Sequence, residues 1–151
     1  MPMPQLPPTN YASPLASIRG NHVALRVPDY EAAKRWYAET LDFRLIHEWP
    51  YGDLRLAYMA PATDDQFWVE ILGGGSPEPR RRYADLDSSL NEVGYHHFCL
   101  QVDSVDDTLA ELRRRGATIG GEPFDLEAIS RRLAFFEDPW GNRIELMEVL
   151  R

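Results

Sequence analysis

The 151-residue sequence lacks the features that mark several common classes of protein. It has one cysteine, Cys99, so no disulfide framework can form within a chain, which indicates a reducing cytoplasmic location. We interpret Cys99 as a small buried apolar residue. No apolar run approaches the roughly 20 residues that span a bilayer. The formal charge of −8 argues against binding to nucleic-acid phosphates, so neither nucleic acid nor a membrane is an expected partner.

The length and the 44% of hydrophobic residues suit one compact domain after an N-terminal extension. Residues 1–17 form the extension. It is rich in proline and has no apolar signal core, so it is interpreted as a loose or docked segment rather than a targeting signal. Residues 18–151 form the domain. It divides into module one at 18–76, a crossover at 77–93 and module two at 94–151.

Hydrophobic periodicity and turn residues predict the same β-α-β-β-β order in both modules, and so an α+β fold. In module one, strands are expected at 22–27, 44–49, 54–60 and 67–72, with a helix at 30–41. In module two, strands are expected at 97–102, 117–119, 132–137 and 142–149, with a helix from 105 to about 115. Asp29 and Ser104 are predicted helix N-caps, and Gly116 is the predicted stop of the second helix. The run Gly73–Gly75 is interpreted as a flexible turn between the modules.

Two histidines and two glutamates recur at one fixed offset along the chain. His22 and His97 are 75 residues apart, and so are Glu70 and Glu145. Each histidine opens a predicted strand, and each glutamate lies in the last strand of its module. Side chains alternate along a strand, so all four are expected on the face opposite the apolar stripes that pack under the helices.

This set of donors is typical of a transition-metal site. A carboxylate on a largely enclosed face needs a partner because desolvating an unpaired charge is costly. Two carboxylates and two neutral imidazoles suit one divalent ion, with positions left open for substrate. The main structural alternative is a metal-free ion pair between Arg26 and a glutamate. His96 has the opposite facing from His97 and is expected to lie beside the site or on the surface. His47 does not lie among residues that would make it a metal ligand.

Four segments resemble the vicinal oxygen chelate family, also called the glyoxalase/bleomycin-resistance/dioxygenase fold. The resemblance covers about residues 18–150. The matching segments are His22-Val-Ala-Leu-Arg-Val, Phe67-Trp-Val-Glu70-Ile-Leu, His97-Phe-Cys-Leu-Gln-Val-Asp and Glu137-Asp-Pro-Trp-Gly-Asn-Arg-Ile-Glu145-Leu. The resemblance implies that the paired modules form a cup-shaped, eight-stranded mixed sheet with helices outside. It also implies that His22, Glu70, His97 and Glu145 are the metal ligands, and that the protein is a homodimer.

The fourth ligand, Glu70, makes the resemblance strongest to glyoxalase I, which implies an isomerase or lyase. One divalent ion (Ni, Co, Zn or Mn) would bind the paired oxygens of a small carbonyl substrate and stabilise an enediolate. Glu145 is the expected catalytic base, with Glu70 as its counterpart. Arg26 is expected to bind a substrate carboxylate, and Trp68 to line an apolar wall. Gly74 stands where bacterial glyoxalase I has an asparagine, so the use of glutathione stays open.

Two other functions are compatible with the family. An Fe(II) extradiol dioxygenase would use His22, His97 and Glu145 as its three ligands. A bleomycin-resistance-like protein would bind a small molecule without catalysis, but such proteins typically lack the four metal ligands.

Overall fold

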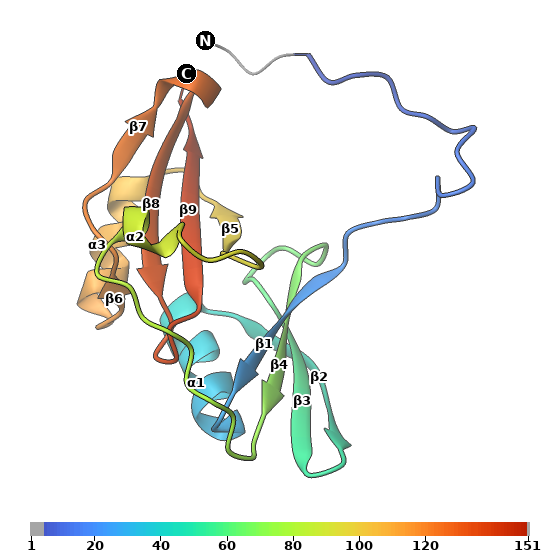
Figure 1. The fold of residues 1–151 in the computed structure, drawn as a ribbon, viewed down its shortest axis with the longest axis vertical. Coiled ribbons are helices and arrows are strands. Elements are labelled where there is room, and N and C mark those ends of the chain that lie inside the picture. The colour runs from blue at the N-terminus through green and yellow to red at the C-terminus, as the bar shows by residue number, and fades with distance from the viewer. Residues whose placement is uncertain (1–4, 151) are drawn as a thin grey trace.

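The protein consists of two β-α-β-β-β modules, as seen in a computed structural model that describes residues 5–150 (Figure 1). The prolines Pro2 and Pro4 of the expected N-terminal extension lie outside the described residues. The predicted fold class, two modules of mixed strands with helices, is confirmed.

Module one contains a four-stranded sheet and one helix. The strands follow the order β1-β4-β3-β2; β1 is parallel to β4, and the other pairs are antiparallel. Its elements are β1 (His22–Val27), α1 (Tyr30–Leu41), β2 (Arg44–Tyr51), β3 (Leu54–Ala60) and β4 (Trp68–Gly73). β1, α1 and β3 have the predicted bounds, and β2 and β4 differ from theirs by one or two residues.

The alternation of side chains in β1 decides which face is available for a site. Leu25 and Val27 are buried under α1, whereas His22, Ala24 and Arg26 are exposed. The helix begins at the predicted cap, since the Asp29 carboxylate accepts a hydrogen bond from the Ala32 N–H at 2.9 Å. The prediction that the apolar residues of β1 pack under the helix, and that the candidate site residues point the other way, is therefore confirmed.

Module two repeats this order with additions. The sheet order is β5-β9-β8-β6, and β7 also pairs with β8. Its elements are α2 (Leu86–Ser89) in the crossover, β5 (Phe98–Gln101), α3 (Val105–Arg114), β6 (Thr118–Ile119), β7 (Phe124–Leu126), the 3-10 turn η1 (Glu127–Ile129), β8 (Arg131–Glu137) and β9 (Arg143–Val149). Ser104 caps α3 as predicted by accepting from the Asp107 N–H, and Gly116 follows the helix with φ +82°.

Two features of module two were not predicted. β7 and η1 occupy residues 124–129, where no strand or helix is expected from the sequence. β7 contains only Phe124, Asp125 and Leu126, all exposed, so its apolar alternation is too short to predict a strand. It forms because Phe124 pairs with Leu133 across to β8, which is a non-local interaction.

Within one chain the modules form separate sheets that meet through a shared apolar core. The core includes Leu25 and Tyr37 from module one, and Phe98 and Ile144 from module two. At this junction the buried Tyr37 hydroxyl donates a 3.0 Å hydrogen bond to Asp138 in the β8–β9 hairpin. Figure 1 shows α1 between the sheet of module one and the β8–β9 end of module two. The modules are thus joined by their apolar sides, and their opposite faces are left open.

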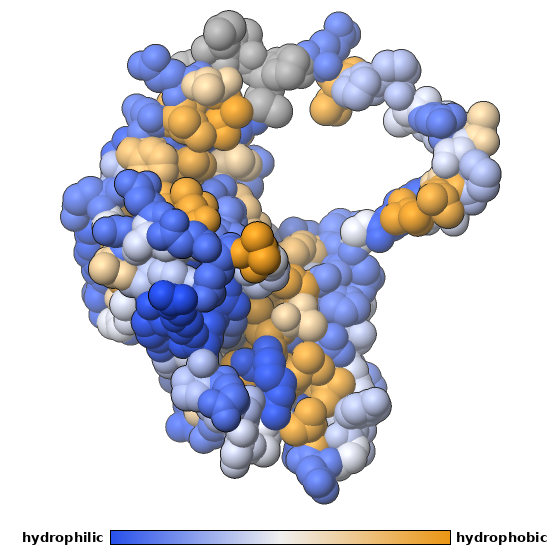
Figure 2. Space-filling model, viewed as in Figure 1, coloured by the Kyte–Doolittle hydropathy of each residue, from blue (hydrophilic) through white to orange (hydrophobic). Residues whose placement is uncertain are grey.

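Residues 5–21, before β1, form an extended arm that loops outward from module one (Figure 1). Large apolar and aromatic side chains on it are exposed, among them Leu6, Tyr11, Leu15 and Ile18. Figure 2 shows a few apolar patches on this otherwise polar arm. The longest helix among residues 5–150 is α1 with 12 residues, and no helix there has the length and apolarity to cross a membrane.

Candidate functional site

The first candidate pair lies at the edge of module one. His22 is the first residue of β1, and Ala24, two residues on, is the register partner of Glu70 in β4. The histidine is therefore diagonal to the glutamate on the same face, and His22 Nε2 lies 3.2 Å from Glu70 Oε2. The His22 side chain is 32% exposed and that of Glu70 13%.

The second pair in module two reproduces this geometry. Cys99 in β5 is the register partner of Glu145 in β9, and His97 lies two residues before Cys99. His97 Nε2 lies 3.3 Å from Glu145 Oε2, with exposed fractions of 30% and 14%. Two segments 75 residues apart thus present the same two groups at the same separation and depth.

An aromatic ring stands beside each pair, at a position that the sequence analysis did not single out. Tyr58 in β3 is the register partner of Glu70, and its ring centroid is 5.2 Å from that of His22. Phe135 in β8 is the register partner of Glu145, and its ring is 5.3 Å from that of His97. These roles follow from cross-strand register, so no local sequence signal could have revealed them.

The spacing within each pair fits two ligands of one ion. Zinc–nitrogen bonds are about 2.1 Å and zinc–oxygen bonds about 2.0–2.2 Å, so two donors at a right angle lie roughly 3 Å apart. The measured separations of 3.2 and 3.3 Å come close to this value without rearrangement of the strands. An imidazole and a carboxylate also match the donor preference of Zn²⁺, Ni²⁺, Co²⁺ and Mn²⁺.

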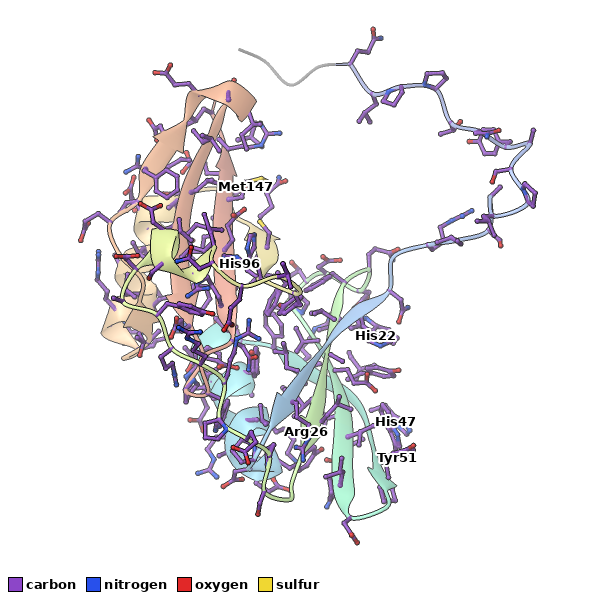
Figure 3. All side chains as sticks on the ribbon, in the orientation of Figure 1. His22, Arg26, His47, Tyr51, His96 and Met147 are labelled. Atoms are coloured by element: carbon purple, nitrogen blue, oxygen red, sulfur yellow. The ribbon has the colours of Figure 1, made fainter. Side chains whose placement is uncertain are left out.

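One chain does not bring the two pairs together. Among residues 5–150, no group of three or more histidine, cysteine, aspartate or glutamate side chains is placed to hold an ion. His22 lies on the sheet of module one, and His96, the neighbour of His97, lies on module two (Figure 3). The expectation that four ligands converge is therefore not met within a single chain, because the modules pack through their apolar sides.

The two expected substrate-binding residues lie on the open face of module one. The Trp68 ring packs 5.2 Å from that of Tyr58, and its Nε1–H donates to the Asp65 carbonyl. The Arg26 guanidinium donates to the carbonyl oxygens of Leu72 and Gly74 at 2.9 and 2.6 Å. Arg26 also lines a cavity of about 590 Å³ between β1 and the crossover. Within residues 5–150, Arg26 makes no ion pair with Glu70, and that carboxylate is instead paired with His22.

Cys99 differs from its sequence-based interpretation as a buried apolar residue. It lies on the exposed face of β5, on the same side as His97 and Glu145. Partial desolvation and the neighbouring Glu145 carboxylate raise the pKa of its thiol to about 12. The thiol is therefore neutral at physiological pH.

His96 contacts both the crossover and the candidate ligand beside it. Its Nδ1 lies 2.7 Å from His97 Nδ1, and its Nε2 lies 2.9 Å from the hydroxyl of Ser89, the last residue of α2. Partial burial lowers the pKa of His96, and the nearby Arg143 guanidinium lowers it further. The neutral imidazole is the favoured form at this position.

Comparisons with known proteins agree with this fold. The family model described as "Glyoxalase/Bleomycin resistance protein/Dioxygenase superfamily" matches residues 19–146. The lactoylglutathione lyase of Salmonella typhimurium is 28% identical over 131 residues, which cover 84% of this chain and 90% of the relative. A probable chloroplastic lactoylglutathione lyase of Arabidopsis thaliana is also 28% identical, over 132 residues and 84% of this chain, but the chain spans only 35% of that relative's length.

A solved structure shows the same architecture. The crystal structure of a glyoxalase family protein from Enterococcus faecalis superposes with a TM-score of 0.71, covering 86% of this chain and 97% of that one. The two sequences are 22% identical, so the likeness is one of fold.

Proposed function

Because this chain belongs to the Glyoxalase/Bleomycin resistance protein/Dioxygenase superfamily, we propose that it is a divalent-metal-dependent lyase or isomerase of the glyoxalase I type. Its substrate is a small carbonyl compound with a neighbouring oxygen. The observation that supports this most directly is the matched pair of His–Glu contacts, which have nearly equal spacing and exposure in the two modules. Each open face has a carboxylate beside an imidazole, and such a reaction needs groups of this kind to bind a metal ion and to transfer a proton.

The proposal requires a second copy of the chain to complete the site. β1 and β5 are each the outer strand of their sheets, and each neighbours the strand that carries the glutamate. Outer strands have unpaired backbone groups that need cover. Placing β1 of one protomer beside β5 of its partner brings His22 and Glu70 against the partner subunit's His97 and the partner subunit's Glu145. A two-fold axis then makes two identical sites per dimer.

The histidines and the glutamates have different roles in the proposed reaction. His22 and His97 would hold the ion, which would supply Lewis-acid stabilisation of negative charge on the substrate oxygens. Glu145 takes the proton from the carbon next to the carbonyl and returns it to the adjacent carbon. Glu70 faces the same substrate from the other module. Both carboxylates are mostly enclosed yet keep some exposure, which suits groups that must reach both ion and substrate.

The open face of module one provides the proposed substrate wall. Trp68 and Tyr58 form an aromatic surface next to His22, and Trp49 extends it with a ring 4.8 Å from that of Tyr58. Arg26 is the proposed partner of a substrate carboxylate. To bind one with both guanidinium nitrogens, it must exchange its contacts with the Leu72 and Gly74 carbonyls.

The test combines metal analysis with one substitution. Protein purified without chelator is expected to contain about one divalent ion per chain. It is expected to isomerise the hemithioacetal of glutathione or a related α-oxo substrate. Glu145→Gln should retain metal but lose turnover by about 10²–10⁴-fold, the usual contribution of a general base.

Glu39→Gln is the matched control, because Glu39 is exposed on α1, away from both open faces. It should leave metal content and turnover unchanged. Full turnover in metal-replete Glu145→Gln protein would show that Glu145 is not the catalytic base. Chains that take up none of Zn²⁺, Ni²⁺, Co²⁺ or Mn²⁺ would contradict the metal-dependent function altogether.

A further inference from the structure

The residue immediately before each candidate ligand histidine contacts that histidine's other ring nitrogen. Asn21 precedes His22, and His96 precedes His97, so the two neighbours obey the same 75-residue offset as the ligands. His22 Nδ1 lies 2.7 Å from Asn21 Oδ1, and His97 Nδ1 lies 2.7 Å from His96 Nδ1. The modules thus place different residue types in the same position, at the same distance.

In module one the direction of this hydrogen bond follows from the chemistry of an amide. The Asn21 side-chain oxygen can only accept, so His22 must carry a hydrogen on Nδ1. The Nε2 atom, 3.2 Å from Glu70, is then the nitrogen available to an ion.

In module two, an ion bound at His97 Nε2 would set the direction through a chain of groups that ends in the crossover. His96 Nε2 lies 2.9 Å from the Ser89 hydroxyl and 3.4 Å from Arg143 Nη1, and because a guanidinium only donates, the longer Arg143 contact favours a bare Nε2. An ion on His97 Nε2 requires the other tautomer of His96, in which the Ser89 hydroxyl donates to the Leu86 carbonyl and its oxygen accepts from His96 Nε2–H. A neutral imidazole with its hydrogen on Nε2 has a bare Nδ1. His96 Nδ1 therefore accepts from His97 Nδ1–H, and His97 Nε2 faces Glu145.

We infer that Asn21 and His96 are equivalent positioning residues, which hold each ligand imidazole with its hydrogen on Nδ1 and present Nε2 to the ion. The inference rests on the proposed metal-dependent function. A ligand histidine whose second nitrogen is held by a hydrogen bond has a fixed tautomer and ring orientation, and removing that partner typically weakens metal binding about 10–100-fold. Asn21 does this alone, whereas His96 needs Ser89 to set its own tautomer.

The experiment exchanges His96 for the residue that the other module uses. Dissociation constants for Zn²⁺ are measured by chelator competition in full-length wild type, His96→Asn and His96→Leu. His96→Leu removes the acceptor and should weaken binding about 10–100-fold. His96→Asn places an amide oxygen near the position of Nδ1 and should restore most of the affinity. His47→Leu is the control, because His47 is an exposed histidine stacked on Trp49 and should bind as wild type.

A second variant and a second readout separate positioning from folding. Ser89→Ala is a small change that frees His96 to adopt the other tautomer, and it should weaken Zn²⁺ binding several-fold without loss of the fold. In zinc-loaded, ¹⁵N-labelled wild type, long-range ¹⁵N–¹H spectra should show a protonated Nδ1 on both His22 and His97. The His97 signal should be lost or exchange-broadened in His96→Leu.

The outcomes distinguish this inference from the proposed function. Wild-type affinity in both His96→Leu and Ser89→Ala would overturn the positioning role and leave the metal site in place. Failure of His96→Asn to improve on His96→Leu would also overturn it. No Zn²⁺ binding by wild type would remove the metal-dependent function, and the positioning role with it.

Discussion

Asp138 is a carboxyl group held at the junction between the modules by hydrogen bonds. Its Oδ1 accepts from the backbone N–H groups of Trp140 and Asn142, and its Oδ2 accepts from Tyr37 and the Asn142 side chain. The residue is 1% exposed. Burial raises the pKa of this carboxyl, and the hydrogen bonds oppose that shift in part.

The effect of Asp138→Asn on the unfolding free energy, measured as a function of pH, tests whether burial outweighs the hydrogen bonds in setting the pKa of Asp138. The substitution leaves donors without an acceptor and should cost about 1–3 kcal/mol of unfolding free energy. A raised folded-state pKa means that the native protein holds the proton more tightly than the unfolded chain. The contribution of Asp138 is therefore full below its unfolded pKa of about 3.9 and declines as pH rises through the folded pKa.

Urea unfolding of wild type and Asp138→Asn between pH 4 and 8 measures the cost as a difference. The cost should be largest at the acidic end and fall to a constant value at higher pH. A cost that grows with pH would mean that the hydrogen bonds depress the pKa below its unfolded value.

At the scale of elements, β4 and α1 approach each other at a glycine. Gly73 is the last residue of β4, paired with Val27, and a Cβ atom there would lie 2.5 Å from Tyr30 Cβ. Tyr30 is in turn fixed by its hydroxyl, which donates to Glu48 in β2. The interpretation of Gly73 as part of a flexible turn is therefore wrong, since this glycine allows the start of the helix to pack against the strand.

Gly73→Ala should accordingly be strongly destabilising. Overpacking costs about 1–3 kcal/mol and occasionally more, and the clash is with backbone and Cβ atoms that cannot move aside, so the upper end is expected. Gly20→Ala is the control, because a Cβ atom at Gly20 would have nothing within 4 Å. Thermal melts of both variants measure the effect. Equal stability of Gly73→Ala and wild type would contradict the close approach of α1 to β4.

The elements that the sequence predicts well are those with local signals. Strand β1 and helix α1 have clear periodicity and are bounded by Pro28 and Asp29, and their bounds were confirmed. β7 was missed because its three exposed residues form a strand only through pairing with β8. The His–Glu pairs were predictable because both members repeat at one offset. Tyr58 and Phe135 were not, because their positions depend on the register of β3 and β8.

At the scale of the molecule, the sequence indicates two modules but not how they face each other. That arrangement depends on the shared core and on the Tyr37–Asp138 contact, which join residues about 100 positions apart. These contacts hold the two His–Glu pairs on separate faces of one chain. The exposed apolar side chains of the arm before β1, and Leu45, Ile46 and Tyr51 on β2, leave apolar surface available to a second chain. The proposed dimer would complete the site and cover such surface.

The most direct test of a site shared between chains is complementation between two inactive variants. One chain carries His22→Ala with Glu70→Ala, and the other carries His97→Ala with Glu145→Ala. Neither variant alone can form a four-ligand site in any dimer. Refolding an equal mixture should produce mixed dimers in which one of the two sites is intact, so about a quarter of wild-type metal and turnover should return. No recovery, although native mass spectrometry shows mixed dimers, would contradict a site built from module one of one protomer and module two of its partner.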